Sequence, residues 1–180
     1  MLPALLLSIA LLPCAGHARP VTGLLAKDDP LPATIPLQVH TGPGADFAVA
    51  LSDPDNGAPV ISGYIRGGEF FRLLVPPGVH DLTIVAGQPD DWQGLQGAFG
   101  ADAAHVTLPL AFRITDGSRR QGHQITLAMQ DGGLRITDQQ DQVICQIADW
   151  DSTQETFDRP GRVPLRYLDR SLTTRSRFCD

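Results

Sequence analysis

The sequence predicts an all-β fold, an antiparallel β-sandwich of about eight or nine short strands. Two observations lead to this fold class. The chain contains short runs in which apolar residues alternate with polar ones, and Gly, Pro, Asp and Asn separate these runs. In addition, the sequence offers no amphipathic helical pattern longer than about three turns.

The runs that we expect to form strands are residues 37–40, 46–51, 59–66, 69–75, 79–86, 106–114, 123–129, 134–137 and 143–147. Several of them alternate strictly, as in Phe47, Val49 and Leu51. Because successive side chains of a strand point to opposite faces of a sheet, each such set predicts one buried stripe.

Turn-forming residues fill the gaps, for example at residues 53–57, 76–78 and 131–133. The first of these segments also contains the carboxylates of a calcium loop. It does not fit an EF-hand, because Gly57 is its fifth residue rather than the sixth and position twelve is Tyr64 instead of Glu. We therefore expect a hairpin turn there.

Residues 1–18 are expected to be a signal peptide, since an apolar run is followed by Gly16 and Ala18 at the −3 and −1 positions of a cleavage site. The alternative is a lipoprotein signal with Cys14 as the lipidated residue, which Pro13 disfavours. The run is shorter than the about 20 residues of a membrane-spanning helix, so no integral membrane segment is expected. The expected location is the periplasm or the medium.

The rest of the chain, after the predicted signal peptide, divides into three regions. Residues 19–34, rich in proline and without periodicity, are expected to be a flexible leader, and residues 35–147 are expected to form the β-sandwich domain. Residues 148–180 are expected to be an irregular, Arg-rich extension, with a short helix over residues 166–174 as an alternative.

The charge of the chain is unevenly distributed. Residues 158–180 contain six arginines and three aspartates, a net +3; because the whole chain carries −6, the remaining residues carry −9. Arg170, Arg175 and Arg177 are thus candidates for binding an anionic partner, although the basic extension could also lie along its own acidic body. Nucleic acid is not an expected partner of an exported acidic protein.

Two cysteines remain after removal of the signal peptide, Cys145 and Cys179. In an oxidising compartment they are expected to form a disulfide, which would tether the extension and contribute about 3–4 kcal/mol to stability. Two free, buried thiols are the alternative. A redox-active pair is disfavoured because the sequence has no Cys-x-x-Cys motif.

The stretch from residue 64 to residue 100 carries Arg-Gly-Gly, Val-Pro-x-Gly, Trp-x-Gly and Phe-Gly, in that order, with Ala86-Gly87 at the place of an Ala-x-Gly element. It resembles an uncharacterised β-sandwich module of exported bacterial proteins and, more loosely, the carboxypeptidase regulatory-like and PEGA domains. The resemblance implies a non-catalytic accessory domain. The matching residues are Arg66, Gly67, Gly68, Val75, Pro76, Gly78, Ala86, Gly87, Trp92, Gly94, Phe99 and Gly100.

Catalytic and metal-binding motifs are not found in the sequence. There is no Gly-x-Ser-x-Gly elbow, and His40, His80, His105 and His123 are too widely spaced for a metal-ligand motif. A catalytic triad assembled only in the fold stays open as an alternative. We expect no enzyme activity, no metal and no cofactor.

A second group of candidate binding residues is aromatic. Trp92 follows Asp90-Asp91, and Trp150 lies between Asp149 and Asp151, so each pair of acids could hydrogen-bond a sugar whose ring stacks on the tryptophan. The alternative is that each tryptophan fills an end of the sandwich. Phe99 is grouped with Trp92 as a contact residue.

These observations predict a secreted or periplasmic, non-enzymatic binding or structural accessory protein. Its partner is expected to be an envelope protein or a polysaccharide. Two alternatives stay open: a hydrolase of cell-wall or extracellular polymer, and an inhibitor of an exported enzyme. The sequence leaves the oligomeric state undetermined.

Overall fold

The computed structural model describes residues 18–116, 119–157 and 165–179; between residues 146 and 174 it describes the backbone of the strands and not the side chains. The predicted signal segment, residues 1–17, lies outside this part of the chain. The fold is all-β, apart from the 3-10 turn η1 (Pro89–Asp91). The strands are β1 (Gly23–Lys27), β2 (Ile35–His40), β3 (Asp46–Ser52), β4 (Pro59–Ile65), β5 (Phe71–Val75), β6 (Gly78–Gly87), β7 (Ala104–Thr115), β8 (Arg119–Gln130), β9 (Gly133–Phe157) and β10 (Leu165–Phe178).

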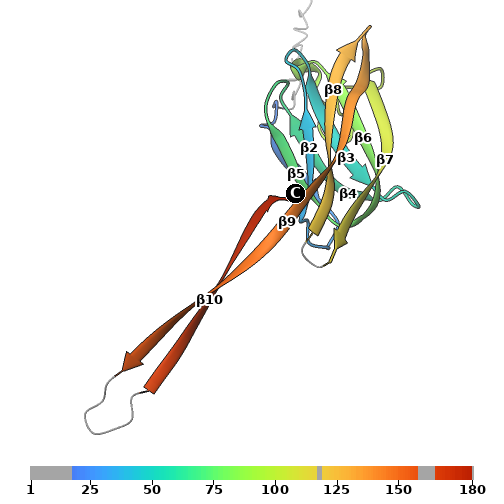
Figure 1. The fold of residues 1–180 in the computed structure, drawn as a ribbon. Coiled ribbons are helices and arrows are strands. Elements are labelled where there is room, and N and C mark those ends of the chain that lie inside the picture. The colour runs from blue at the N-terminus through green and yellow to red at the C-terminus, as the bar shows by residue number, and fades with distance from the viewer. Residues whose placement is uncertain (1–17, 117–118, 158–164, 180) are drawn as a thin grey trace, which may run out of the picture.

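The strands form one sheet in the order β1-β4-β3-β6-β7-β8-β2-β5, with β9 added to β8 and β10 added to β9. The two ends of this path, β1 and β5, approach each other, so the body is a nearly closed, barrel-like sheet (Figure 1). The predicted sandwich is not confirmed. The all-antiparallel arrangement is wrong, because β2 and β8 are parallel. A parallel pair requires a long connection, and residues 41–118 provide it.

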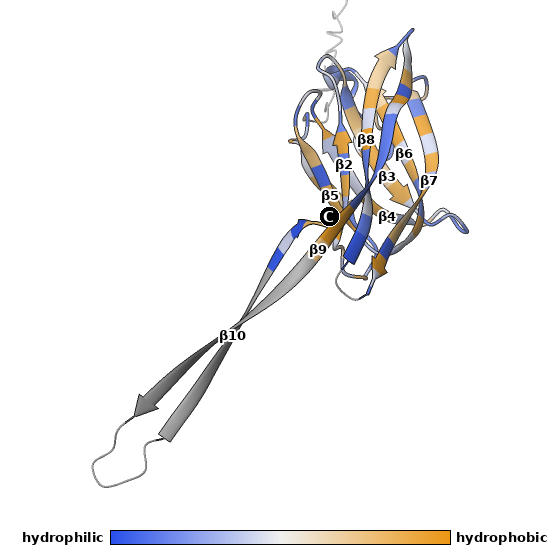
Figure 2. Ribbon diagram, viewed as in Figure 1, coloured by the Kyte–Doolittle hydropathy of each residue, from blue (hydrophilic) through white to orange (hydrophobic). Residues whose placement is uncertain are grey.

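The strand predictions are largely confirmed. The alternating residues 71–75 form β5, in which Phe71, Leu73 and Val75 are buried, and residues 79–86 lie within β6. The main difference is in β9, where the predicted strands at residues 134–137 and 143–147 are one continuous strand. The polar residues between them look like a turn in the sequence, but they lie on an outer strand next to β8 and are hydrophilic there (Figure 2).

The predicted flexible leader contributes to the sheet instead, because β1 pairs with β4. Side chains hold the residues before it as well. Arg19 pairs with Asp46, Arg66 Nε donates to the carbonyl oxygen of Pro20 at 2.8 Å, and Thr22 hydrogen-bonds to Glu69. The N-terminal segment is therefore joined to β3, β4 and the turn after β4.

The C-terminal region is a long β-hairpin, not an irregular tail or a helix. The fourteen residues of β10 pair with β9 without interruption, and beyond Cys145, where β9 leaves β8, the two strands project away from the body as an arm (Figure 1). The backbone of β10 from Leu165 to Thr174 therefore does not lie along the acidic body. The predicted disulfide between Cys145 and Cys179 is confirmed, and it joins the two strands at the root of the arm.

The main hydrophobic core fills the body between the strands. Its largest residues come from strands that are distant in sequence, such as Phe47 of β3, Phe71 of β5 and Phe112 of β7. A second, smaller cluster consists of Tyr64, Trp92 and Phe99. The connection between β6 and β7, which carries Trp92 and Phe99, packs there onto β4.

Candidate functional site

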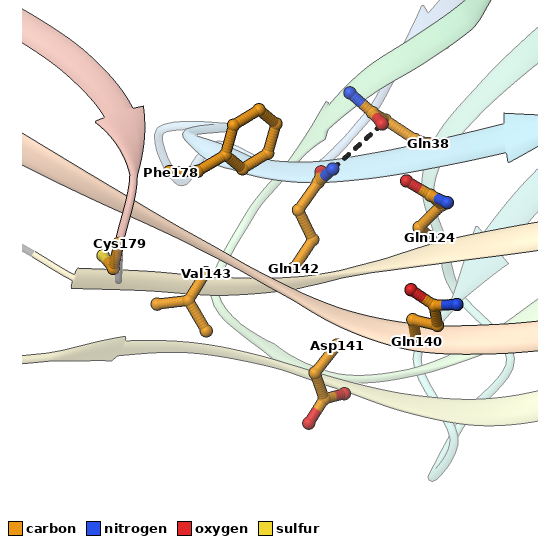
Figure 3. Close-up of a pocket in the computed structure, with 8 residues that line it drawn as sticks. All are labelled: Gln38, Gln124, Gln140, Asp141, Gln142, Val143, Phe178 and Cys179. Atoms are coloured by element: carbon orange, nitrogen blue, oxygen red, sulfur yellow. Dashed lines mark hydrogen bonds between the residues drawn. The ribbon is translucent and has the colours of Figure 1, made fainter.

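A pocket of about 420 Å³ lies where the arm joins the body. This volume is in the range of pockets that hold small organic molecules, about 300–1,000 Å³. Residues from β2, β8, β9 and the C-terminal end of β10 form its walls (Figure 3). The lining residues are Gln38, Gln124, Gln140, Asp141, Gln142, Val143, Phe178 and Cys179.

The register of the sheet places three of these glutamines in a row across neighbouring strands. Gln38 of β2 is opposite Gln124 of β8, and Gln124 is opposite Gln140 of β9. Directly opposite residues share one face of a sheet. The pocket therefore has a floor of carboxamide groups on the outer face of the body.

A β-bulge in β9 decides which residues face the pocket. Thr126 is opposite Asp138 whereas Leu127 is opposite Ile136, so Thr137 is the extra residue. A bulge changes which alternate residues point to which face. Without it, Gln140 and Gln142 would be on the opposite face of β9.

Gln142 is the most informative residue of the site. It is only 7 % exposed, and its Nε2 donates to Gln38 Oε1 at 2.9 Å (Figure 3). Its Oε1 is buried and has no hydrogen-bond partner. Since a buried acceptor without a partner costs free energy, a ligand donor that reached this oxygen after a small shift of the side chain would recover that cost.

The chain makes room for Gln142 at Gly122, the residue opposite it on β8. A Cβ atom at position 122 would lie 1.8 Å from the carbonyl oxygen of Pro36 on β2. Only glycine permits this close approach of β2 to β8, which also brings Gln38 within reach of Gln142.

The opposite wall of the pocket comes from the end of β10. Phe178 is 62 % exposed and presents its ring beside Gln142 and Gln38 (Figure 3). The backbone N–H of Cys179 donates to the carbonyl oxygen of Val143 at 3.0 Å, and the disulfide fixes the same residue to β9. The aromatic ring is therefore held in place next to the carboxamides.

Asp141 is the only acidic residue among the described residues that line the pocket, and its carboxylate points away from the glutamines (Figure 3). It accepts a hydrogen bond from Gln121 at 2.9 Å and lies 3.1 Å from Nδ1 of His123. A histidine beside a carboxylate is a requirement of many hydrolases. Here, however, Nε2 of His123 lies 3.0 Å from the carbonyl oxygen of Ala111, and Nδ1 is buried without a hydrogen-bond partner, so neither ring nitrogen is exposed to a substrate.

The predicted contact residues Trp92 and Phe99 are both buried, with exposures of 6 % and 7 %. Trp92 packs edge-on against Tyr64 with ring centroids 4.8 Å apart, and Phe99 packs against Trp92. A Cβ atom at Gly87 would lie 2.3 Å from Phe99, so glycine at this position makes room for the Phe99 side chain. These aromatic residues support the fold, and their rings are not accessible for stacking.

Beneath this cluster lies a buried carboxylate, Asp46, which the sequence did not reveal. Arg19 binds it through two nitrogens at 2.6 and 2.8 Å, Tyr64 donates its hydroxyl at 2.7 Å, and the N–H of Gly67 donates at 3.0 Å. Burial alone would raise the pKa of Asp46, but these hydrogen bonds outweigh it and lower the pKa. Burial and the hydrogen bond to this carboxylate raise the pKa of Tyr64. Arg19, Tyr64 and Gly67 supply these donors, so the carboxylate of Asp46 holds parts of the fold together rather than binding a ligand.

The remaining predicted residues lie on the arm. The side chains of Trp150 and Arg170 are outside the described part, whereas Arg175 and Arg177 are exposed. The register places Trp150 opposite Leu172 and Asp149 opposite Thr173. Because neighbouring positions in a strand belong to opposite faces, Trp150 does not share a face with Asp149 or Asp151. The same alternation separates Arg170 from Arg175 and Arg177.

Two other hollows, of about 400 and 500 Å³, flank the connection between β6 and β7. Their walls consist mainly of small residues such as Ala101 and Ala103, and no buried polar atom without a partner lines them. Within the described ranges, no group of three or more His, Cys, Asp or Glu residues could hold a metal ion. The glutamine pocket is therefore the best-developed candidate site.

Fold and site together define a disulfide-linked, all-β protein with an amide-lined pocket at the root of a projecting hairpin. Comparison of the chain with protein-family models, curated proteins and solved structures finds no match. In the part of the chain that the structure describes, no helix is long and apolar enough to cross a membrane.

Proposed function

We propose that this protein is an exported, non-catalytic binding protein of the cell envelope, and that its glutamine pocket binds a neutral, polyhydroxylated ligand of the kind found in polysaccharides. The observation that carries the proposal is the buried, unpartnered Oε1 of Gln142 among three further carboxamides. Each carboxamide offers both donors and an acceptor, which matches sugar hydroxyls because these also donate and accept.

Two further features support a sugar ligand. The ring of Phe178 is exposed beside the carboxamides, so the apolar face of a sugar ring could pack on it. The only ionic side chain among the described lining residues, that of Asp141, points away from the glutamines.

The export part of the proposal is supported by the apolar N-terminal segment and the disulfide, since disulfides persist in oxidising compartments. The resemblance to carboxypeptidase regulatory-like and PEGA domains belongs to the same proposal, because those domains are accessory and non-catalytic.

The sandwich architecture of those domains is also part of the proposal. The first part of β7 pairs with β6 and its last part pairs with β8, an arrangement compatible with a strand that passes between the two layers of a sandwich.

The test is a titration of the protein, purified from the periplasm as residues 19–180 and checked by intact mass. The probes are neutral tetrasaccharides of glucose, mannose, galactose and N-acetylglucosamine. Gln124→Ala, Gln140→Ala and Phe178→Ala should each weaken binding of the active probe by about five- to tenfold, the value of one lost contact.

Gln139→Ala is the matched control, because Gln139 lies between Gln140 and Asp138 on β9 and occupies the face opposite to the pocket. The Gln139→Ala variant should bind the active oligosaccharide with the affinity of the unmodified protein. Absence of binding to every probe, or equal losses for Gln139→Ala and Gln140→Ala, would refute the proposed site.

A further inference from the structure

The arm has two long strand edges without partners. Among the described residues, β10 pairs with β9 alone, and β9 has no second partner beyond Cys145. An isolated two-stranded ribbon is only marginally stable in water, and an exposed edge is a template for pairing with another strand.

The edge of β10 carries four arginines and one aspartate, but it lacks the other features that block edge pairing. Its fourteen residues contain no Pro, Lys or Gly, and its pairing with β9 has no bulge. Natural proteins use such features to prevent edge pairing. A long, regular edge without them is suited to accept another strand.

The sequence of β10 is complementary to itself. If two copies pair antiparallel about a two-fold axis through Leu172, residues 166–178 of one copy are opposite residues 178–166 of the other. Asp169 is then opposite Arg175, twice by symmetry, whereas Arg177 is opposite Tyr167 and Arg166 is opposite Phe178. Arginine next to an aromatic ring is a favourable pair, and the alignment brings no like charges opposite each other.

Other alignments are less favourable. An axis through Thr173 also puts Asp169 opposite an arginine, Arg177, but it pairs only residues 168–178, a shorter segment. An axis through Asp169 or Arg170 puts like charges directly opposite each other. An axis through Ser171 pairs a segment of equal length but leaves Asp169 opposite Thr173, without an ion pair. Leu172 is also opposite Trp150 within each hairpin, so the axis through Leu172 aligns four apolar residues across four strands.

We propose that two copies of this chain associate through β10, in an antiparallel pairing centred on Leu172. The two hairpin arms together form a four-stranded sheet, and the two bodies lie at its opposite ends. Each copy uses the same surface, as a two-fold symmetric dimer requires.

A charge-exchange cycle tests this pairing by sedimentation velocity of the disulfide-containing protein, residues 19–180. The unmodified protein is expected to be a dimer. Asp169→Arg and Arg175→Asp each create two like-charge contacts across the axis, so each should weaken dimerisation by about tenfold or more. The double variant Asp169→Arg/Arg175→Asp restores opposite charges and should restore the dimer.

The cycle leaves each hairpin intact, because Asp169 is opposite Thr153 and Arg175 is opposite Ile147 within the same chain. Far-UV circular dichroism of all variants checks this. A protein that stays monomeric at every concentration would overturn the proposal. So would a dimer that both single variants leave unchanged, or one that the double variant does not recover.

Discussion

The buried carboxylate of Asp46 shows how single residues join the N-terminal segment to the body. Three chain segments meet at this group: Arg19 before β1, Tyr64 of β4 and Gly67 in the turn after β4. A charge in the interior is tolerated only when hydrogen bonds replace its hydration. The spacing of these residues along the chain gives no indication of the network.

We predict that Tyr64→Phe lowers the free energy of unfolding by roughly 1.5–3 kcal/mol, the value of a hydrogen bond to a charged group. The Phe ring preserves the packing against Trp92, so the loss reports on the hydroxyl alone. Urea unfolding at neutral pH measures it. Tyr167→Phe on the arm is the control and should leave the stability of the body unchanged.

The same variant should change the acid stability. Because folding lowers the pKa of Asp46, its contribution is present above the carboxyl's ordinary pKa, about 3.9, and is lost as the pH falls through the lower, folded value. Without the Tyr64 hydroxyl the folded pKa rises, so acid unfolding should begin at a higher pH. An unchanged acid midpoint would show that Arg19 and Gly67 suffice.

At the scale of elements, the parallel pairing of β2 with β8 builds the candidate site. It brings Gln38, from the first half of the chain, next to Gln124 and Gln142 from the second half. The close approach at Gly122 is the local condition for this pairing, since the carbonyl oxygen of Pro36 occupies the space of a side chain.

We therefore predict that Gly122→Ala destabilises the protein by about 1–3 kcal/mol or more, as overpacking of an interior position does, and that it abolishes ligand binding in the pocket. Urea unfolding and titration with the active oligosaccharide provide the two measurements. Gly42→Ala is the matched control: a Cβ atom there meets nothing within 4 Å, and its stability should change by less than about 0.5 kcal/mol.

At the scale of the whole molecule, the body and the arm are structurally separate. The hydrophobic core lies in the body, and within the described strands the projecting parts of β9 and β10 pair with each other alone. The disulfide at the root lies between these two parts and also supports the pocket wall at Cys179.

We predict that the body folds without the arm. Replacing residues 148–174 by Asn-Gly joins Ile147 to Arg175, which are opposite each other, through a tight turn and retains both cysteines. The thermal midpoint of this variant should match that of the full chain at low protein concentration. A large drop would mean that the arm stabilises the body.

The sequence was sufficient for the elements whose physical cause is local. Alternating apolar residues gave β3, β5 and β6, because period-two burial needs only neighbours along the chain. It was insufficient for β1, for the polar middle of β9 and for β10. These strands form because a neighbouring strand supplies hydrogen bonds. Their own sequences contain no alternating apolar pattern that would have predicted a strand.

By itself, the sequence determined the all-β class, most strand positions and the pairing of Cys145 with Cys179. Only the tertiary structure decided which residues meet: the glutamines of β2, β8 and β9 in one pocket, and Trp92 and Phe99 in the interior rather than on the surface. The reason is that strand order and the bulge at Thr137 set which faces meet, and both depend on contacts between segments far apart in the chain.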